Sequence, residues 1–109
     1  MKYNNSDIGG NIVKEDERYI VKDNTALKNL IVSSTDLKPS MSTSGHSHAG
    51  QEEVYYFIKG SGKMELDKSS ISFVEGDVVL IEDGVFHRVH AGPHGAYSVS
   101  YTHLRAHET

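Results

Sequence analysis

Short runs of apolar and β-branched residues recur along the chain, and turn residues separate them. The runs that we expect to be strands are residues 12–13, 18–21, 27–34, 54–58, 63–66, 71–74, 78–81 and 86–90. Glycine-rich stretches at 60–62 and 92–95 read as turns, and no stretch has a helical period. Short strands spaced about eight to twelve residues apart predict an all-β barrel or sandwich.

Composition narrows the class of protein. With 109 residues the chain is expected to be one domain, and its net charge of −4 gives no reason to expect a nucleic-acid or membrane partner. The absence of cysteine excludes disulfides and thiolate metal ligands. The first ten residues lack the apolar core of a signal peptide, so we expect a cytoplasmic location.

Candidate metal ligands gather in the stretch 45–62. His46 and His48 lie two residues apart, so on a strand their side chains share one face. After a turn at 49–51, Glu53 begins the hairpin partner, and His87 follows a later turn at 82–84. Imidazole and carboxylate ligands suit one divalent transition metal, and Mn, Fe, Ni, Co, Cu and Zn all remain open. Glu52 faces the opposite side and is expected to be solvated.

The first half of this pattern resembles a motif of the cupin superfamily. That motif is H-x-H, three or four residues, a glutamate, six residues and a glycine, and His46, His48, Glu53 and Gly60 fit it. The glycine that usually precedes the first histidine is replaced by Ser40.

The second half resembles the other cupin motif. Gly76, Gly84 and His87 match, while Glu82 stands in place of a proline and Ala91 in place of an asparagine. Those two departures concern the stiffness of a turn and the end of a strand, and they leave the metal ligand in place.

The resemblance covers about residues 27–97 and implies both a fold and a site. The fold would be a double-stranded β-helix, the cupin barrel of jelly-roll type. The site would hold one metal on His46, His48, Glu53 and His87, with positions left open for water or a small-molecule ligand.

Strand parity suggests which side chains surround such a metal. Tyr55 and Phe57 share the face of Glu53 and are candidates for substrate binding. Tyr55, the one catalytic candidate on this face, would hydrogen-bond a substrate or metal-bound water, or else be a packed barrel tyrosine. Glu65 is a further titratable candidate, whereas the parity of His90 favours a surface or interface position over a general base.

Two classes of function stay open. The first is a metal-dependent enzyme, an isomerase, epimerase or oxygenase acting on a sugar, sugar phosphate or small oxygenated acid. The second is a non-catalytic module that binds or senses a metal or small ligand. By analogy with cupins the enzyme is preferred, although a fold does not fix a function.

A homodimer is also expected. Tyr56 and Ile58 face outward from the predicted barrel, and residues 30–32 are predicted to form an edge strand that needs cover.

The segment 99–109, VSYTHLRAHET, resembles the translation of a transposon-based sequencing adapter, residue for residue. We therefore expect a non-native tail here, and we exclude His103 and His107 as ligands despite their i, i+4 spacing. The expected organisation is an amino-terminal arm with short strands at 1–26, a barrel at 27–98 and this tail. The tail is nevertheless expected to supply strand residues up to Thr102, continuing a strand that begins near Ala96.

Overall fold

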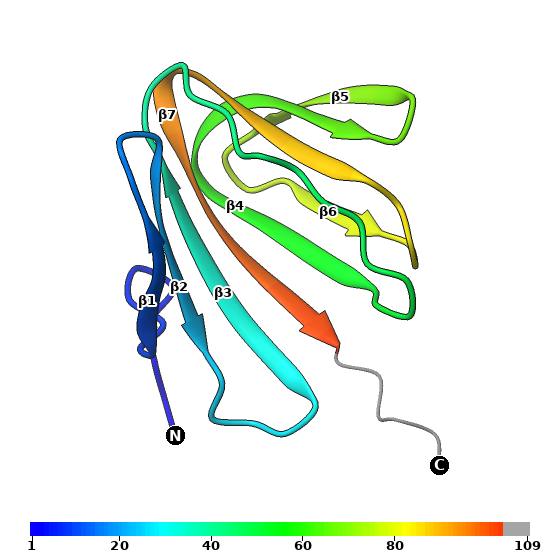
Figure 1. The fold of residues 1–109 in the computed structure, drawn as a ribbon. Coiled ribbons are helices and arrows are strands. Elements are labelled where there is room, and N and C mark those ends of the chain that lie inside the picture. Colours follow the sequence, from blue (N-terminus) through cyan, green and yellow to red (C-terminus); the bar gives the residue numbers. More distant parts are fainter. Residues whose placement is uncertain (104–109) are drawn as a thin grey trace.

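Strands make up all the regular structure of this protein (Figure 1). The computed structural model describes residues 1–103. Its strands are β1 (Asn11–Glu15), β2 (Tyr19–Asn24), β3 (Leu30–Leu37), β4 (Glu53–Leu66), β5 (Ser69–Val74), β6 (Val78–Ile81) and β7 (His87–His103). The predicted all-β class is confirmed, and this part of the chain contains no helix that could cross a membrane.

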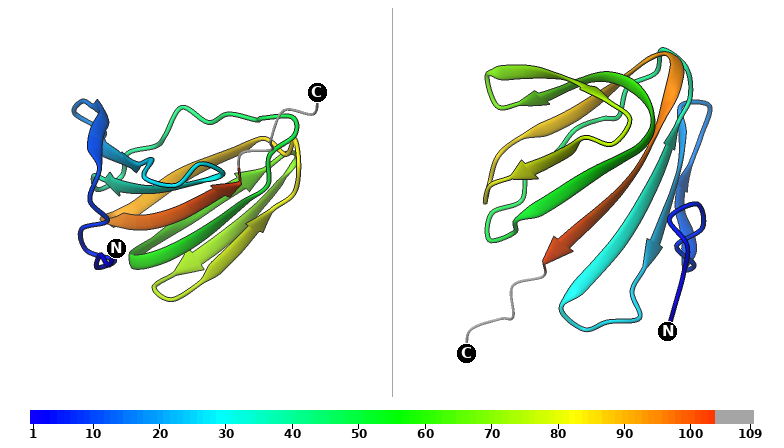
Figure 2. Two further views of the ribbon diagram at one scale, coloured as in Figure 1. Left: turned by 90° about the horizontal axis from the view of Figure 1, so that it is seen from below. Right: turned by 180° about the vertical axis from the view of Figure 1, so that it is seen from behind.

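The central strand of the sheet is β7. The strand order is β1-β2-β3-β7-β4-β5, with β6 pairing with the other end of β4, and every pairing is antiparallel. The second half of β7 pairs with β3 on one side and with β4 on the other. The sheet curls on itself, as the views from below and from behind show (Figure 2).

The apolar interior is built from alternate residues of these strands. Phe57 and Phe73 stack with their ring centroids 3.7 Å apart, and Met64 is fully buried with them. Side chains of this size each contribute about 1.5–3 kcal/mol by leaving water. This core fills one part of the interior, and the cavity described below occupies another.

The segment that carries His46 and His48 is not a regular strand, which corrects the sequence prediction. Residues 38–52, here called the strap, run alongside the first half of β7 (Figure 1). Their only pairings within the described chain are isolated bridges, Ser42 with His90 and His46 with His87. Gly45, at φ 81°, lies between these bridges and takes a left-handed conformation that interrupts a ladder. The predicted hairpin between this segment and the strand of Glu53 is therefore absent.

Two predicted turns are wrong because the strands pass through them. Residues 60–62 lie inside β4, where the register with β7 shifts, and Gly60 has φ 84°. Residues 92–95 lie inside β7, between the parts that pair with different halves of β4. Glycine at such positions allows a bulge or bend without ending the strand.

The strand predicted at 27–34 is observed at Leu30–Leu37, and it is not an edge. It lies between β2 and β7, so the predicted edge at 30–32 is wrong. The edges of the main path are β1 and β5.

The predicted final strand at 97–102 is confirmed, since β7 continues to His103. Residues 104–109, including His107, lie outside the described residues. The non-native origin of 99–109 stays a prediction, although its first five residues occupy the middle of the sheet.

Candidate metal centre

Three of the four predicted ligands lie close together, where the buried Glu53 and His87 meet the half-exposed His46. Among the described residues His46, Glu53 and His87 form a group whose nitrogen and oxygen ligand atoms lie within 4.8 Å of one another. Nε2 of His46 lies 3.7 Å, and Nε2 of His87 lies 3.2 Å, from the same Oε1 of Glu53. Two imidazoles thus converge on one carboxylate oxygen.

Backbone pairing places the two histidines side by side. The amide of His46 donates to the carbonyl of His87 at 3.0 Å, and the reverse bond measures 2.9 Å. Directly paired residues put their side chains on one face of a sheet. Their rings accordingly lie edge to face, with centroids 4.3 Å apart.

Glu53 reaches the group from β4, on the other side of the interior. It is the first residue of that strand and lies between Ile81 of β6 and Thr102 of β7. Its side chain is buried, with 8% of its surface exposed. The carboxylate is therefore held by a strand flanked on both sides.

The orientation of His87 is what a metal ligand requires. Its Nδ1 lies 3.1 Å from the carbonyl oxygen of Val85, which can only accept a hydrogen bond, so Nδ1 carries the proton. In neutral imidazole Nε2 then holds a lone pair. That atom is fully buried and makes no hydrogen bond, although the Glu53 oxygen is close. A cation bound between them would satisfy both groups, and a carbonyl acceptor behind a ligating histidine is a common arrangement.

The charges of the group favour an ionised carboxylate. Burial alone would raise the pKa of Glu53, but the imidazoles of His46 and His87 outweigh it and bring the pKa to about 2. Burial alone would likewise lower the pKa of His87, and here the Glu53 carboxylate and the Val85 carbonyl outweigh it and raise that pKa. The Glu53 carboxylate is therefore ionised in the neutral pH range.

The fourth predicted ligand, His48, lies nearby but outside the group. Its ring centroid is 4.7 Å from that of His46, and it lines the same cavity. Because the strap is irregular here, the strict two-residue alternation of a strand does not hold.

The group opens into a cavity of about 440 Å³. Hydroxyl groups line much of its wall, from β3 (Ser33, Thr35), from the strap (Thr43, Ser44) and from β7 (Ser100, Thr102). Such a wall offers many donors and acceptors to a small polar ligand.

The two predicted substrate contacts lie in different surroundings. Tyr55 lines the cavity, and its ring lies edge to face with His87 at 5.7 Å. Phe57 is fully buried and stacks on Phe73 in the apolar core, outside the set of residues that line the cavity.

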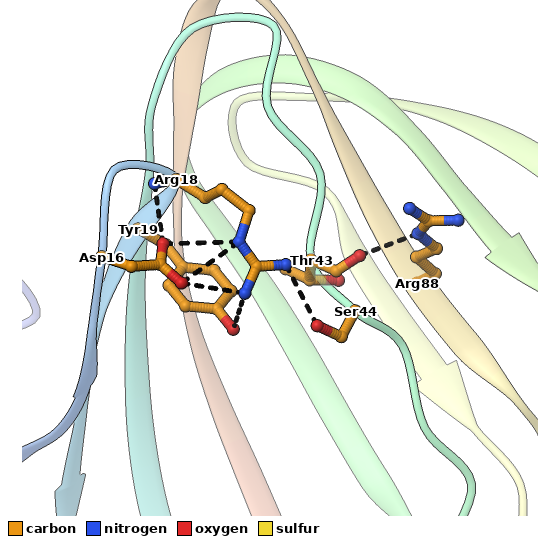
Figure 3. A network of polar contacts seen from close by, with 6 residues as sticks. All are labelled: Asp16, Arg18, Tyr19, Thr43, Ser44 and Arg88. Atoms are coloured by element: carbon orange, nitrogen blue, oxygen red, sulfur yellow. Dashed lines mark hydrogen bonds and ion pairs between the residues drawn. The ribbon is translucent and has the colours of Figure 1, made fainter.

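The strap is fastened by two arginines that approach it from opposite sides (Figure 3). Arg18 stacks on the ring of Tyr19, binds Asp16, and donates from Nη1 to the Ser44 hydroxyl at 3.0 Å. Arg88 donates from Nε to the carbonyl of Thr43 at 2.7 Å. These contacts hold Thr43 and Ser44, which lie three and two residues before His46.

His90 and Glu65 lie away from the cavity. Nε2 of His90 contacts Oε1 of Glu65, and Nδ1 of His90 lies 2.6 Å from the Ser42 hydroxyl. Neither residue lines the cavity, in keeping with the parity of His90.

One match identifies the family to which this chain belongs. The family model for the cupin domain matches residues 34–98, more than half of the chain. The chain belongs to the cupin family. No curated protein matches this cupin.

Solved structures that resemble this cupin share its fold at low sequence identity. KdgF from Halomonas sp. is 14% identical with a TM-score of 0.77, over 88% of this chain and 87% of that one. TT1209 from Thermus thermophilus is 18% identical with a TM-score of 0.76, over 84% and 89%. A mutant of Bacillus subtilis oxalate decarboxylase OxdC is 20% identical with a TM-score of 0.78, over 88% of this cupin but only 28% of that chain. The predicted double-stranded β-helix is thereby confirmed.

Sequence reasoning missed several residues of the cavity wall. Ser100 and Thr102 belong to the segment that is predicted to be a tail, yet both line the cavity beside Tyr55 and Glu53. The polar alternation at 98, 100 and 102 is the signal that could have found them. Lys14 of β1 also lines the cavity, and the sequence pattern around it gives no sign of this.

Proposed function

We propose that this cupin binds one divalent transition metal through His46, Glu53 and His87, with His48 as the fourth ligand. We further propose that it is a metal-dependent enzyme of the isomerase, epimerase or oxygenase type. Its substrate would be a sugar, a sugar phosphate or a small oxygenated acid.

One observation carries the metal proposal. Nε2 of His87 is buried without a hydrogen bond, and its proton-bearing partner nitrogen faces the carbonyl of Val85. An unsatisfied buried polar atom costs about 1–3 kcal/mol, so such an atom calls for a bound partner. The ionised Glu53 beside it favours a cation as that partner.

The residues around the substrate would then have separate roles. His46, Glu53 and His87 would hold the metal, which supplies Lewis-acid polarisation of a substrate oxygen when bound. The hydroxyl wall would orient a polar ligand, and the buried core behind Phe57 would keep water from that side. Tyr55 would donate a hydrogen bond to the ligand.

Metal analysis of the purified protein tests this proposal. Wild-type protein should retain about one metal per chain, and calorimetric titration with Ni²⁺ or Mn²⁺ should give one site. His87→Gln and Glu53→Gln should each lower the affinity at least tenfold, since loss of outer partners alone costs about 10–100-fold.

The control is His94→Gln, which removes an exposed histidine of β7 outside the group. It should bind metal like the wild type. Equal affinity in His87→Gln and wild type, measured on protein shown to be folded by circular dichroism, would refute the site.

A second candidate function is a non-catalytic module that binds a metal or small ligand. It is favoured by the scarcity of titratable groups beside the cluster, since Glu65 and His90 face elsewhere. A screen of metal-loaded protein against sugars, sugar phosphates and hydroxy acids separates the two, because only the enzyme turns a ligand over.

We also propose a homodimer as the working unit. It is supported by exposed apolar side chains on β4, β6 and β7, among them Tyr56, Leu80 and Tyr101.

A further inference from the structure

A β-bulge in β1 turns a lysine toward the cavity. Ile12 pairs with Lys22, and Lys14 pairs with Val21, so Val13 is the extra residue of the bulge. Without the bulge, Ile12 and Lys14 would share one face, because side chains alternate along a strand.

The faces can be assigned from their partners. Lys22, the partner of Ile12, binds Asp7 of the amino-terminal arm outside the sheet. Val21, the partner of Lys14, lines the cavity, and so does Lys14 itself. Val13 lines it too, as expected where a bulge places two consecutive side chains on one side.

The ammonium group of Lys14 has no protein partner within the described chain. Among residues 1–103 no ion pair or hydrogen bond engages it, and the other cavity acid on this side, Asp23, accepts a hydrogen bond from Ser33 at 2.7 Å. The positive charge of Lys14 and the negative charge of Asp23 cancel each other. A divalent metal would add two positive charges, and Glu53 supplies only one negative charge. The metal-loaded cavity would therefore be net positive, in a protein whose overall charge is −4.

We propose that Lys14 is a specificity-determining residue that binds a second anionic group, a carboxylate or phosphate, on the ligand. The inference rests on the proposed metal site, which would hold the ligand's first oxygens. The ligand class is then a hydroxylated acid with an anion at each end, long enough to lie along the hydroxyl wall.

Three common ligands test the proposal because they share one metal-chelating end. Gluconate has an α-hydroxycarboxylate and a neutral far end, glucarate has a second carboxylate there, and 6-phosphogluconate has a phosphate. Calorimetry on Mn²⁺-loaded wild-type protein should show glucarate or 6-phosphogluconate binding at least fivefold more tightly than gluconate. The two anionic ligands also tell a carboxylate site from a phosphate site.

The variants isolate Lys14. Lys14→Gln should remove the preference while changing gluconate affinity less than twofold, and Lys14→Arg should restore most of it. Lys68→Gln is the matched control, since it removes the same charge from an exposed turn. As a readout independent of turnover, acetylation of Lys14, followed by mass spectrometry, should be slowed by the preferred ligand and not by gluconate.

The ways in which the test can fail are distinguishable. Wild-type protein that takes up no metal would overturn both the metal site and this inference. Metal and gluconate binding with no preference for either doubly anionic ligand would overturn the role of Lys14 alone. Equal losses for all three ligands in Lys14→Gln, or the same losses in Lys68→Gln, would also overturn it.

Discussion

At the scale of single residues, the hydroxyl of Tyr55 is suited to donating a hydrogen bond and not to accepting a proton as a base. Burial raises the pKa of its hydroxyl, and the nearby negative charge of Glu53 raises that pKa further. The phenol therefore stays protonated at neutral pH and serves as a hydrogen-bond donor, not as a base. Its ring packs edge to face on His87, so Tyr55 is held beside the group of His46, Glu53 and His87.

Removing that hydroxyl should weaken ligand binding and leave the fold intact. Tyr55→Phe is expected to lower gluconate affinity of the Mn²⁺-loaded protein by about 2- to 10-fold, the equivalent of one hydrogen bond. Calorimetry measures the affinity, with Tyr56→Phe on the outer face as control. Unchanged affinity in Tyr55→Phe would assign Tyr55 to packing alone.

Sequence spacing located the candidate metal ligands better than it located the cavity wall. His46, Glu53 and His87 lie close together, and turns that are visible in the sequence precede Glu53 and His87. Lys14 could not be foreseen, since a bulge reverses its face and no residue type marks this bulge. The position of His48 also depends on the irregular path of the strap, which alternation cannot describe.

At the scale of elements, β4 remains one strand through a glycine pair that reads as a turn. Gly60 has φ 84°, and a Cβ there would collide with the carbonyl oxygen of Gly95. Gly62 is equally tight, since its Cβ would collide with the carbonyl oxygen of His90. The neighbouring strand β7 thus approaches so closely that only glycine fits.

Two alanine substitutions distinguish the free-energy cost of a steric collision with β7 from the cost of backbone strain. Gly76 has a similar φ of 92° but nothing within 4 Å of its Cβ position. Gly76→Ala should cost about 1–2 kcal/mol, the strain of a left-handed residue. Gly60→Ala should cost about 1–3 kcal/mol more, because β7 must shift. Urea unfolding measures both, and equal losses would contradict the steric argument.

The sequence predicts some strands better than others, because it does not show whether a glycine bends a strand or ends it. β6 was located correctly because turns bound a short apolar run at both ends. β4 and β7 were each divided in two, because glycines that bend a strand and glycines that end one look alike in sequence. What decides between them is the partner strand, which lies far away along the chain.

At the scale of the whole molecule, one outer face of the sheet carries apolar side chains without cover from the described residues. Val54 pairs with Leu80 on one side and Tyr101 on the other, and Tyr56 pairs with Val78. Leu80 is 71% exposed, and Tyr56 and Tyr101 are 44% and 43% exposed. A patch spanning neighbouring strands in this way is typical of a protein interface.

The homodimer that we propose should form through this face. Wild-type protein should sediment as a dimer at micromolar concentration, and Leu80→Lys should shift it to monomer by placing a charge in the interface. Leu27→Lys is the control, because Leu27 is also exposed but lies in the loop before β3. A monomeric wild type would contradict the proposal, as would an unaltered dimer in Leu80→Lys.

The central place of β7 has a consequence for synthesis of the chain. Leu30 pairs with His103 and Leu37 with Ala96. One edge of β3 therefore has no partner strand until these later residues have been synthesised. One edge of β4 likewise pairs with this later segment of β7. Folding dominated by such distant pairings is slow, in the range of milliseconds to seconds. Until residues 96–103 leave the ribosome, β3 and β4 each present an unpaired edge, and these edges are where a chaperone or another nascent copy would bind first.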